Sequence, residues 1–462
     1  MAKFASYPTY KPSNVSWLGD IPDHWEVWKI THGFDRIGSG TTPKSDNPMF
    51  YDGDIPWVTT SELRETFITD TAQKVTEDAV ATHSALKIYP KGSLAIAMYG
   101  ATIGRLGMLE IDATFNQACC VFAEPTVFDT RFVYYWLWMR RPILISLSNG
   151  GGQPNLSQDD LKKLWIPIPN IPEQQTIARF LDFKTAQIDA LIAKQQSLLA
   201  KLAEKRTALI SHAVTKGLDP SVPMKDSGAA WLGDIPAHWQ RMSMARVIYK
   251  FEQGWSPSCD EREASLDEWG VLKSGCVNYG VFQERAHKTL PPSIDPIPSL
   301  EVHAGDILMC RASGSKHLIG SVAMVRKCRP KLIFSDKTYR ITLERDTIEP
   351  EFFILLMKSK YLRDQIELSI SGADGLANNI PQSSVKGYQL VLPPTIDEQK
   401  TISTLLNKKI EDVDAQEAKI LEVIGRLQEY RSALITNTVT GKIDVRGFQI
   451  PDSPIATEPS HA

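Results

Sequence analysis

The chain has 462 residues, which is more than one hydrophobic core usually holds, so two or more domains are expected. Hydrophobic residues make up 42% and charged residues 23%, as in an ordinary globular protein, and the formal net charge of −3 does not indicate nucleic-acid binding. The sequence holds no run of 18 apolar residues and no apolar core of a signal peptide near its start, so we expect a cytoplasmic protein without a membrane span.

A nine-residue block follows a polar arm of 16 residues and occurs twice. Residues 17–25 read WLGDIPDHW, and residues 231–239 read WLGDIPAHW, at an offset of 214. The Trp and Pro residues predict a turn that is held against a core. His24 and His238 could suggest catalysis, but a repeated structural turn explains them better. We call this stretch the tryptophan block.

Each tryptophan block is followed by a body of mixed α and β character. In the first body, loop residues GTTPK (40–44) precede strand-like runs at 55–63 and 93–99 and an apolar stretch of helical length at 130–147. The second body has the same order. The two bodies have diverged, and only weak echoes remain: RFVYY from Arg131 against EFFIL from Glu351, and Asn155-Leu-Ser against Asn379-Ile-Pro. The offset grows from 214 to 225, so the second body has gained eleven residues.

A long amphipathic segment ends each repeat. Residues 173–215 align with 398–440 without a gap, and 18 of 43 positions are identical. Stepping four and three residues from Ile177 gives the predicted seam of the first segment: Ile177, Leu181, Lys184, Ile188, Leu191, Gln195, Leu198, Leu202, Lys205 and Leu209. The same steps from Ile402 give a second seam that includes Lys409, Val413, Gln416, Ile420, Val423 and Leu434. Such a narrow stripe predicts helices of about 60 Å that pair as a coiled coil, within one chain or between chains.

No catalytic motif is visible in the sequence. Walker A, Gly-x-Gly-x-x-Gly, GxSxG and HExxH patterns are absent, as is the Asn/Asp-Pro-Pro-aromatic signature of amino-methyltransferases. Glu417-Ala-Lys419 resembles half of a nuclease motif, but it lies on the heptad segment, where charges usually face solvent. The six cysteines form no CxxC pair, so we expect buried free thiols rather than a zinc site. This pattern favours recognition over catalysis.

The chain resembles the specificity subunits of Type I restriction–modification systems. The resemblance rests on the twin WLGxIPxHW blocks, on GTTPK and IPW (55–57), and on the twin EQ-TI segments that end in RTALI and RSALI. It implies an α+β protein with two mixed α/β target-recognition domains, separated by two long helices that form an intramolecular antiparallel coiled coil with a pseudo-two-fold repeat. The seams alone leave the direction of pairing open, because either direction sets two lysines together.

The resemblance divides the chain into seven segments. They are an arm with the first tryptophan block (1–25), target-recognition domain 1 (26–171), helix 1 (172–215), a linker with the second block (216–239), target-recognition domain 2 (240–396), helix 2 (397–440) and a C-terminal tail (441–462).

The resemblance also implies the function and the partners. Each target-recognition domain would read one half of a bipartite, asymmetric DNA site, and the helices would set the half-site spacing. The chain would be a non-catalytic subunit that binds two methyltransferase subunits and, in the full complex, two motor-nuclease subunits. It would hold no cofactor of its own, since S-adenosylmethionine, ATP and Mg²⁺ would be bound by those partners.

Loop position and donor chemistry suggest which residues contact DNA. The candidates are Thr42, Lys44, Tyr99 and Arg105 in the first domain and Ser256, Asn278, Arg311, Ser313 and Lys316 in the second. Residues 305–340 also hold eight Lys/Arg against two Asp, which fits either a phosphate-facing surface or a solvated face. Two other functions stay open: a nuclease with an unrecognised site, and a coiled-coil scaffold that binds only proteins.

Overall fold

A computed structural model describes residues 4–146, 155–371 and 378–450 of the chain. The chain forms two compact units: the first comprises residues 1–195 and 422–462, and the second comprises residues 196–421. The first three residues of the predicted arm and the last twelve of the predicted tail lie outside the described residues. In the described part, no helix has the length and apolar character needed to cross a membrane.

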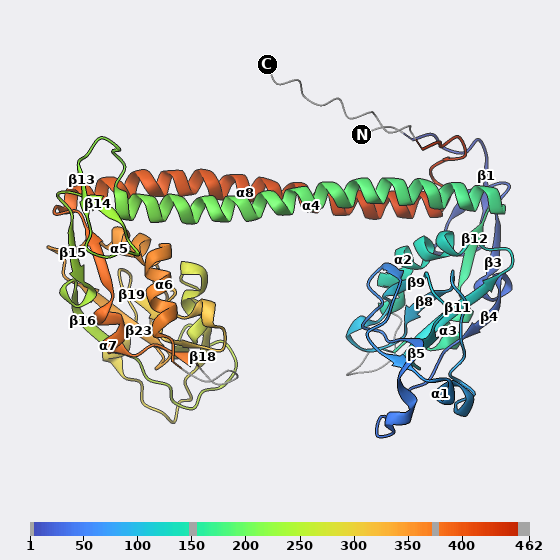
Figure 1. Cartoon of the computed structure of the whole chain (residues 1–462), viewed down its shortest axis with the longest axis horizontal. Coiled ribbons are helices and arrows are strands. Elements are labelled where there is room, and N and C mark those ends of the chain that lie inside the picture. Colours follow the sequence, from blue (N-terminus) through green and yellow to red (C-terminus); the bar gives the residue numbers. More distant parts are fainter. Residues whose placement is uncertain (1–3, 147–154, 372–377, 451–462) are drawn as a thin grey trace, which may run out of the picture. The chain divides into compact units, whose positions relative to one another are not determined.

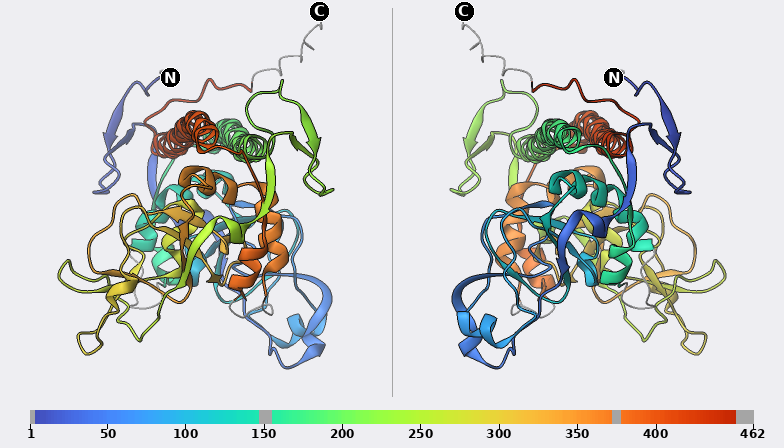
Figure 2. Two further views of the ribbon diagram at one scale, coloured as in Figure 1. Left: turned by 90° about the vertical axis from the view of Figure 1, so that its left-hand side faces the viewer. Right: turned by 90° about the vertical axis from the view of Figure 1, so that its right-hand side faces the viewer.

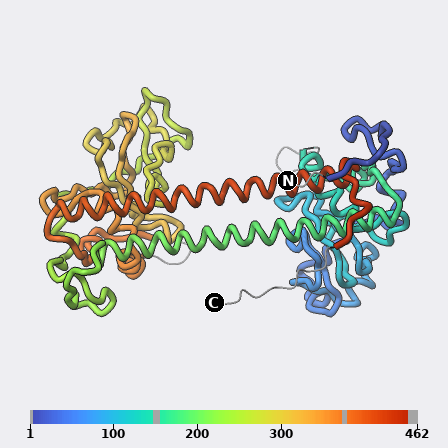
Figure 3. The backbone as a smooth tube through the Cα atoms, turned by 90° about the horizontal axis from the view of Figure 1, so that it is seen from above, coloured from blue at the N-terminus to red at the C-terminus, as the bar shows by residue number. Residues whose placement is uncertain are grey.

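Two long helices each run through both units. Helix α4 (Ile171–Lys216) begins in the first unit and ends in the second, whereas α8 (Ile396–Val439) begins in the second and ends in the first. Within each unit the two helices lie side by side (Figures 1 and 3). The start of each helix is therefore beside the end of the other, and the pairing is antiparallel and intramolecular. This confirms the arrangement that the resemblance implied and that the heptads left open.

One ion pair between the helices occurs twice. In the first unit, Arg431 Nε donates to Asp189 Oδ1 at 3.0 Å. In the second unit, Arg206 contacts Asp414 and also donates to Glu417 Oε2 at 3.0 Å. Arg206 and Arg431 are 225 residues apart, and so are Asp189 and Asp414. The internal repeat therefore produces the same contact twice. Polar pairs of this kind fix the register of a helix pair.

The predicted seam is wrong at alternate positions. Leu191, Leu198 and Val423 are 46%, 44% and 42% exposed, whereas Ile424 is buried. The structure buries Thr185 rather than Lys184, and partly buries the residues one position after the predicted ones, namely Ile192, Leu199, Arg206, Ile410 and Glu417. At Leu191/Ile192, Leu198/Leu199 and Val423/Ile424, adjacent apolar residues made both phases fit the sequence. Lys205 and Lys409 are exposed rather than buried in the seam, but both line one pocket beside the helix pair.

The first unit holds a five-stranded sheet and a three-stranded sheet. The larger sheet has the order β4 (Phe34–Gly38), β11 (Cys119–Pro125), β8 (Leu94–Ala97), β9 (Leu106–Leu109), β6 (Thr66–Ile68). The smaller has the order β10 (Thr114–Phe115), β5 (Tyr51–Val58), β7 (Lys74–Val75). The helices are α1 (Glu77–Thr82), α2 (Thr130–Ser146) and α3 (Gln158–Lys162), and β12 (Trp165–Ile168) pairs with β3 (Glu26–Lys29).

The second unit repeats this plan. A four-stranded sheet has the order β16 (Ile248–Gln253), β23 (Thr338–Leu343), β19 (Ile307–Cys310), β21 (Val322–Met324). A three-stranded sheet has the order β18 (His287–Thr289), β17 (Gly270–Leu272), β22 (Leu332–Phe334). The helices are α5 (Pro350–Met357), α6 (Lys360–Ser369) and α7 (Gln382–Gly387), and two further pairs join β15 (Gln240–Ser243) to β25 (Gln389–Leu392) and β20 (Ala312–Ser313) to β24 (Asn378–Asn379).

Strand registers show that the two bodies share an equivalent parallel ladder. Phe115 pairs with Val58 in a parallel ladder of the first unit, and Phe334 pairs with Leu272 in a parallel ladder of the second. All four side chains are buried in their cores. The α+β class and the repeated mixed bodies are thus confirmed, whereas the seven predicted segment boundaries stay a prediction.

The tryptophan blocks are held by the first turn of each long helix. Each block contains the second strand of a hairpin (Figure 2). The hairpins join β1 (Tyr10–Pro12) to β2 (Asp20–Pro22) and β13 (Met224–Asp226) to β14 (Asp234–Pro236). In the first unit, Trp25 Nε1 donates to Glu173 Oε1 at 3.1 Å, and His24 Nε2 lies 2.8 Å from Glu173 Oε2. Trp239 Nε1 makes the same bond to Glu398 at 2.9 Å. His238 also contacts Glu398, so both histidines are structural, as predicted.

The glutamine after each of these glutamates attaches the body to the helix. Gln174 accepts the backbone N–H of Asp129 at 2.7 Å and donates to the carbonyls of Val127 and Pro169. Gln399 repeats this with the N–H of Glu349 at 2.8 Å and with the carbonyls of residues 347 and 393. Both side chains are fully buried. The EQ pair of the repeat therefore anchors two different parts of each unit.

Candidate nucleic-acid interface

The hairpin between β8 and β9 carries two of the predicted DNA contacts. Tyr99 is the second residue after β8, and Arg105 directly precedes β9. The turn needs glycine, because Gly100 and Gly104 have φ angles of +79° and +74°. Burial raises the pKa of the half-buried Tyr99 phenol, so it stays neutral and can donate a hydrogen bond. Among the described residues, the Arg105 side chain has no hydrogen bond or ion pair.

The GTTPK loop is fixed beside this hairpin by the strand that carries IPW. Trp57 Nε1 donates to the carbonyl of Thr41 at 3.2 Å, and Tyr51 Oη donates to the carbonyl of Pro43 at 2.7 Å. The Thr42 hydroxyl donates to Gln117 Oε1 at 2.6 Å. These bonds explain why the two motifs occur together. They leave Lys44 exposed, and its ammonium has no partner in the part of the chain that the structure describes.

In the second unit, two candidates meet at one turn. The Ser256 hydroxyl donates to Asp336 Oδ1 and also accepts the backbone N–H of Asp336 at 3.2 Å. Arg311 Nη1 donates to the carbonyl of Asp336 at 3.1 Å. Burial alone would raise the pKa of Asp336, but the bonds from Ser256 and Lys337 outweigh it and lower the pKa. Asp336 therefore stays ionised and holds Ser256 and Lys337 in place.

Thr42 and Ser256 occupy equivalent positions. Gly40 and Gly254 precede them by two residues, and a Cβ atom at either glycine would collide with the carbonyl oxygen of Phe115 or Phe334, which are themselves equivalent. Each hydroxyl then bonds to the residue two positions after that phenylalanine. The same donor thus stands at the same place in both units.

The other second-unit candidates are spread over neighbouring segments. Ser313 lies in β20, which pairs with Asn378 of β24, and its hydroxyl accepts the N–H of Ser315 at 3.2 Å. Lys316 is exposed and begins a 3-10 turn (Lys316–Leu318). Asn278 is half-buried in a separate 3-10 segment (Ser274–Gly280) that packs against β19, β20 and β21. Ser256, Arg311 and Ser313 therefore gather near one turn, while Asn278 lies on an adjoining segment.

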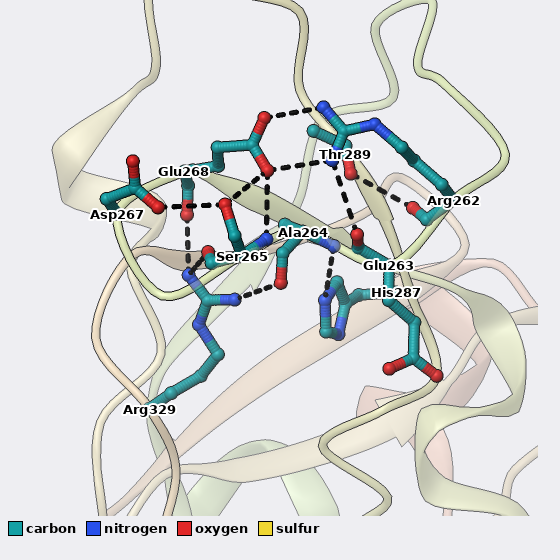
Figure 4. Close-up of polar contacts among 9 residues, drawn as sticks. All are labelled: Arg262, Glu263, Ala264, Ser265, Asp267, Glu268, His287, Thr289 and Arg329. Carbon is teal, nitrogen blue, oxygen red and sulfur yellow. Dashed lines mark hydrogen bonds and ion pairs between the residues drawn. The ribbon is translucent and has the colours of Figure 1, made fainter.

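Many cations of the basic stretch at 305–340 make contacts within the unit, although Lys316, Arg326, Lys327 and Lys337 are also exposed. Arg329 is 8% exposed, and its guanidinium donates to three backbone carbonyls of the 264–268 loop at 2.6–2.7 Å (Figure 4). Arg340 bonds to Glu252 at 3.0 Å, and Arg326 to Glu351 at 2.8 Å. Most of these cations brace the fold of the unit. A count of charges cannot distinguish a cation that faces solvent from one that closes a loop.

Sequence reasoning missed the two acceptors of the candidate surface. Gln117 and Asp336 position Thr42 and Ser256, but they lie in loops between strands, and no motif marks them. The bonds become visible only when the strand registers are known.

From the sequence we expect no metal site among the acidic, histidine and cysteine side chains of the described residues. No group of three or more His, Cys, Asp or Glu side chains within them could hold a metal ion. Glu417, which suggested half of a nuclease motif, is an acceptor for Arg206 on the helix pair. All six cysteines are free; four are buried and Cys259 and Cys328 are half-buried.

Comparisons with known proteins show what the chain is similar to. The model of the Type I restriction modification DNA specificity domain matches residues 22–200. The specificity subunit of the Type I restriction enzyme EcoEI from Escherichia coli is 34% identical over 209 residues, which span 45% of this chain and only 35% of that protein. The EcoKI specificity subunit from Escherichia coli K12 is 21% identical over 437 residues, or 92% of this chain and 90% of that one.

A solved structure shares the whole fold. It is described as "Structural basis underlying complex assembly and conformational transition of the type I R-M system", and it superposes with a TM-score of 0.63 at 15% identity. The match covers 92% of this chain and 99% of that chain. Both of these relatives are named as specificity subunits of Type I restriction enzymes. Residues 22–200 thus match the model of a Type I restriction modification DNA specificity domain, and the chain as a whole is similar to specificity subunits of Type I restriction enzymes.

Proposed function

We propose that each unit of this chain reads one half of a bipartite DNA sequence. The observation that supports this most directly is the pair of equivalent loop surfaces, which share a frame and differ in side chains. Thr42 and Ser256 stand at the same place, whereas the hairpin beside them carries Tyr99 and Arg105 in one unit and Arg311, Ser313 and Lys316 in the other. Two surfaces with one backbone plan and different donors fit two different half-sites.

The proposed readers are the nine residues named from the sequence. Side chains at loop tips can enter the major groove, where all four base pairs present different donors and acceptors. Arg105 and Lys44, which are uncommitted in the described structure, suit base or phosphate contacts. Arg311 is partly committed to Asp336, so we assign it a smaller role in reading and a larger one in holding its turn.

The two long helices are proposed to set the distance between the half-sites. Half-sites read by two linked domains are typically about one helical turn of DNA apart, ~34 Å. The antiparallel ion pairs and the buried seam positions make each end of the helix pair a stiff support for its domain. An asymmetric target follows, because the two domains differ.

The partners are proposed from the family. We propose that two methyltransferase subunits bind this chain, that two motor-nuclease subunits join them in the full complex, and that S-adenosylmethionine, ATP and Mg²⁺ are bound by those subunits. The product would be methylated adenine in both half-sites, or cleavage of unmodified DNA.

One experiment tests the function. The chain is expressed with its methyltransferase subunit in a host without other methylation, and methylated bases are mapped across the genome. We expect a single bipartite motif that disappears when this chain is omitted. A purified chain that cleaves or methylates DNA alone would favour a nuclease or another enzyme, and a complex without sequence-dependent DNA binding would favour a protein-binding scaffold.

A further inference from the structure

Residues that both reading domains have kept mostly have a structural reason. Gly40 and Gly254 leave room for a phenylalanine carbonyl, as described above. Phe132 and Phe352 are fully buried at the start of α2 and α5. A residue that is identical in two otherwise divergent bodies therefore needs a structural or functional explanation.

Asn155 and Asn379 are another retained pair, and they occupy equivalent positions. Asn155 forms an antiparallel bridge with Tyr99, the second residue after β8, and Asn379 pairs with Ala312, the second residue after β19. The backbone N–H that follows each asparagine confirms the register. The N–H of Leu156 donates to the carbonyl of residue 98 at 2.7 Å, and the N–H of residue 380 donates to the carbonyl of residue 311 at 3.0 Å. Both asparagines thus lie against the hairpin of the candidate surface.

No structural role explains why these residues are asparagine. Neither has a positive φ angle, so the backbone does not favour asparagine over other residues. The backbone of Asn379 exchanges hydrogen bonds with Ser371, but its side-chain amide makes none within the described residues, and neither does that of Asn155. Asn155 is exposed and Asn379 is half-exposed.

The surroundings suit the recognition of a base. A bridge holds the backbone of each asparagine, and its short side chain has few rotamers to lose on binding. Tyr99 lies across the bridge in the first unit, and Ser313 adjoins the bridge partner in the second. Each amide therefore stands among the side chains proposed to read DNA.

We propose that Asn155 and Asn379 are equivalent base-reading residues, each of which recognises an adenine in its own half-site. A side-chain amide can donate to adenine N7 and accept from adenine N6, and this bidentate pairing distinguishes adenine from the other bases. The inference rests on the proposed function and adds to it one specificity-determining residue in each domain.

The test uses the full chain with its methyltransferase subunit and maps methylated motifs in cells for Asn155→Ala, Asn379→Ala and the unaltered protein. A good bidentate contact contributes about 1–3 kcal/mol of discrimination, so about tenfold or more relaxation is expected at one base pair. Asn155→Ala should relax the half-site read by the first unit alone, and Asn379→Ala the other. Each variant is the control for the other, since the unaffected half-site reports a folded complex.

A conservative variant sharpens the test. Asn155→Asp keeps the shape but replaces the N–H donor by a second acceptor, so preference should move from adenine toward cytosine, whose N4 is a donor. Unchanged motifs in all variants, or equal loss in both half-sites, would overturn the inference while leaving the proposed function intact. If the unaltered complex methylates no bipartite motif, the proposed function itself is overturned.

Discussion

Glu173 and Glu398 perform the same task at two degrees of burial. Glu173 accepts bonds from Trp25, His24 and the Tyr7 phenol, and its carboxylate is 4% exposed. Burial, together with the bond to Glu173, raises the pKa of Tyr7 far above its usual range. Glu398 has two such donors and is 33% exposed.

This difference predicts unequal costs of removal. Glu173→Ala leaves buried donors unpaired and should lower the stability of its surroundings by about 3–5 kcal/mol. Glu398→Ala should cost clearly less, because water reaches its donors. Hydrogen exchange of the peptides that carry Trp25 and Trp239 measures the free energy of local opening at each site. A local measurement is needed because a chain of two units has no single free energy of unfolding. An equal or larger effect of Glu398→Ala would contradict the role of burial.

Asp182 makes the first unit sensitive to pH. Burial raises the pKa of Asp182, although the Tyr135 hydroxyl at 2.8 Å and Arg131 at 3.2 Å oppose the shift. A carboxyl with a raised folded pKa contributes stability that is complete below its unfolded pKa, about 3.9, and is lost as pH rises through the folded value.

Asp182→Asn should therefore remove part of the pH dependence. Asparagine can still accept from Tyr135 but carries no charge to bury. The melting temperature of the variant, relative to the unaltered protein, should rise between about pH 4 and pH 7. Thermal unfolding at several pH values in that window is the measurement, and a constant difference across it would show that Asp182 is not the titrating group.

Donor chemistry in loops led to Thr42 and Ser256, which the structure places at equivalent positions. The same reasoning gave too much weight to the basic stretch, since at least six of its eight cations make internal bonds such as those of Arg329. Asn155 and Asn379 appeared in the sequence only as a weak echo. Equivalence that depends on strand register cannot be obtained from spacing when the offset between repeats changes along the chain.

At the scale of elements, the long helices were the most predictable part. Their gapless repeat and apolar periodicity predicted both, and α4 and α8 begin and end close to the expected residues. The phase of the seam was not predictable, because adjacent apolar pairs such as Leu191 with Ile192 satisfy two heptad phases. The short strands of the bodies were visible only where alternating apolar residues were flanked by turn residues.

A matched pair of leucines tests the corrected seam. Leu202 is 6% exposed and Leu198 is 44% exposed, although both lay in the predicted seam. Leu202→Ala should lower the stability of the helix pair by about 2–4 kcal/mol, whereas Leu198→Ala should cost well under half of that. Urea unfolding followed by circular dichroism compares the two. Similar losses would restore the seam as first predicted.

At the scale of the whole molecule, duplication was readable from the tryptophan blocks and the helix repeat. The direction of helix pairing was not, since it depends on the Asp189–Arg431 contact and its repeat, which join residues more than 200 positions apart. The proposed role of the helices as a spacer makes a quantitative prediction about the DNA target.

Inserting one heptad into each long helix should lengthen the spacer of the target. Seven residues add about 10.5 Å to a helix, or about three base pairs of DNA. Insertion between residues 195 and 196 in α4 and between 421 and 422 in α8 keeps the seam in phase. Mapping methylated motifs for the extended chain is the measurement. The spacer role would be refuted if the half-sites kept their sequences and the number of base pairs between them stayed unchanged.

The buried glutamines carry a consequence for how such a chain can evolve. Gln174 and Gln399 hold their domains through backbone N–H and C=O groups alone, at residues 127, 129, 347 and 349. Every amino acid except proline offers both groups. A domain from a related chain, if its backbone follows the same path, could therefore replace either domain by recombination and still form these hydrogen bonds. The attachment does not depend on which DNA sequence the domain recognises. A new specificity can therefore arise when a single domain is exchanged by recombination.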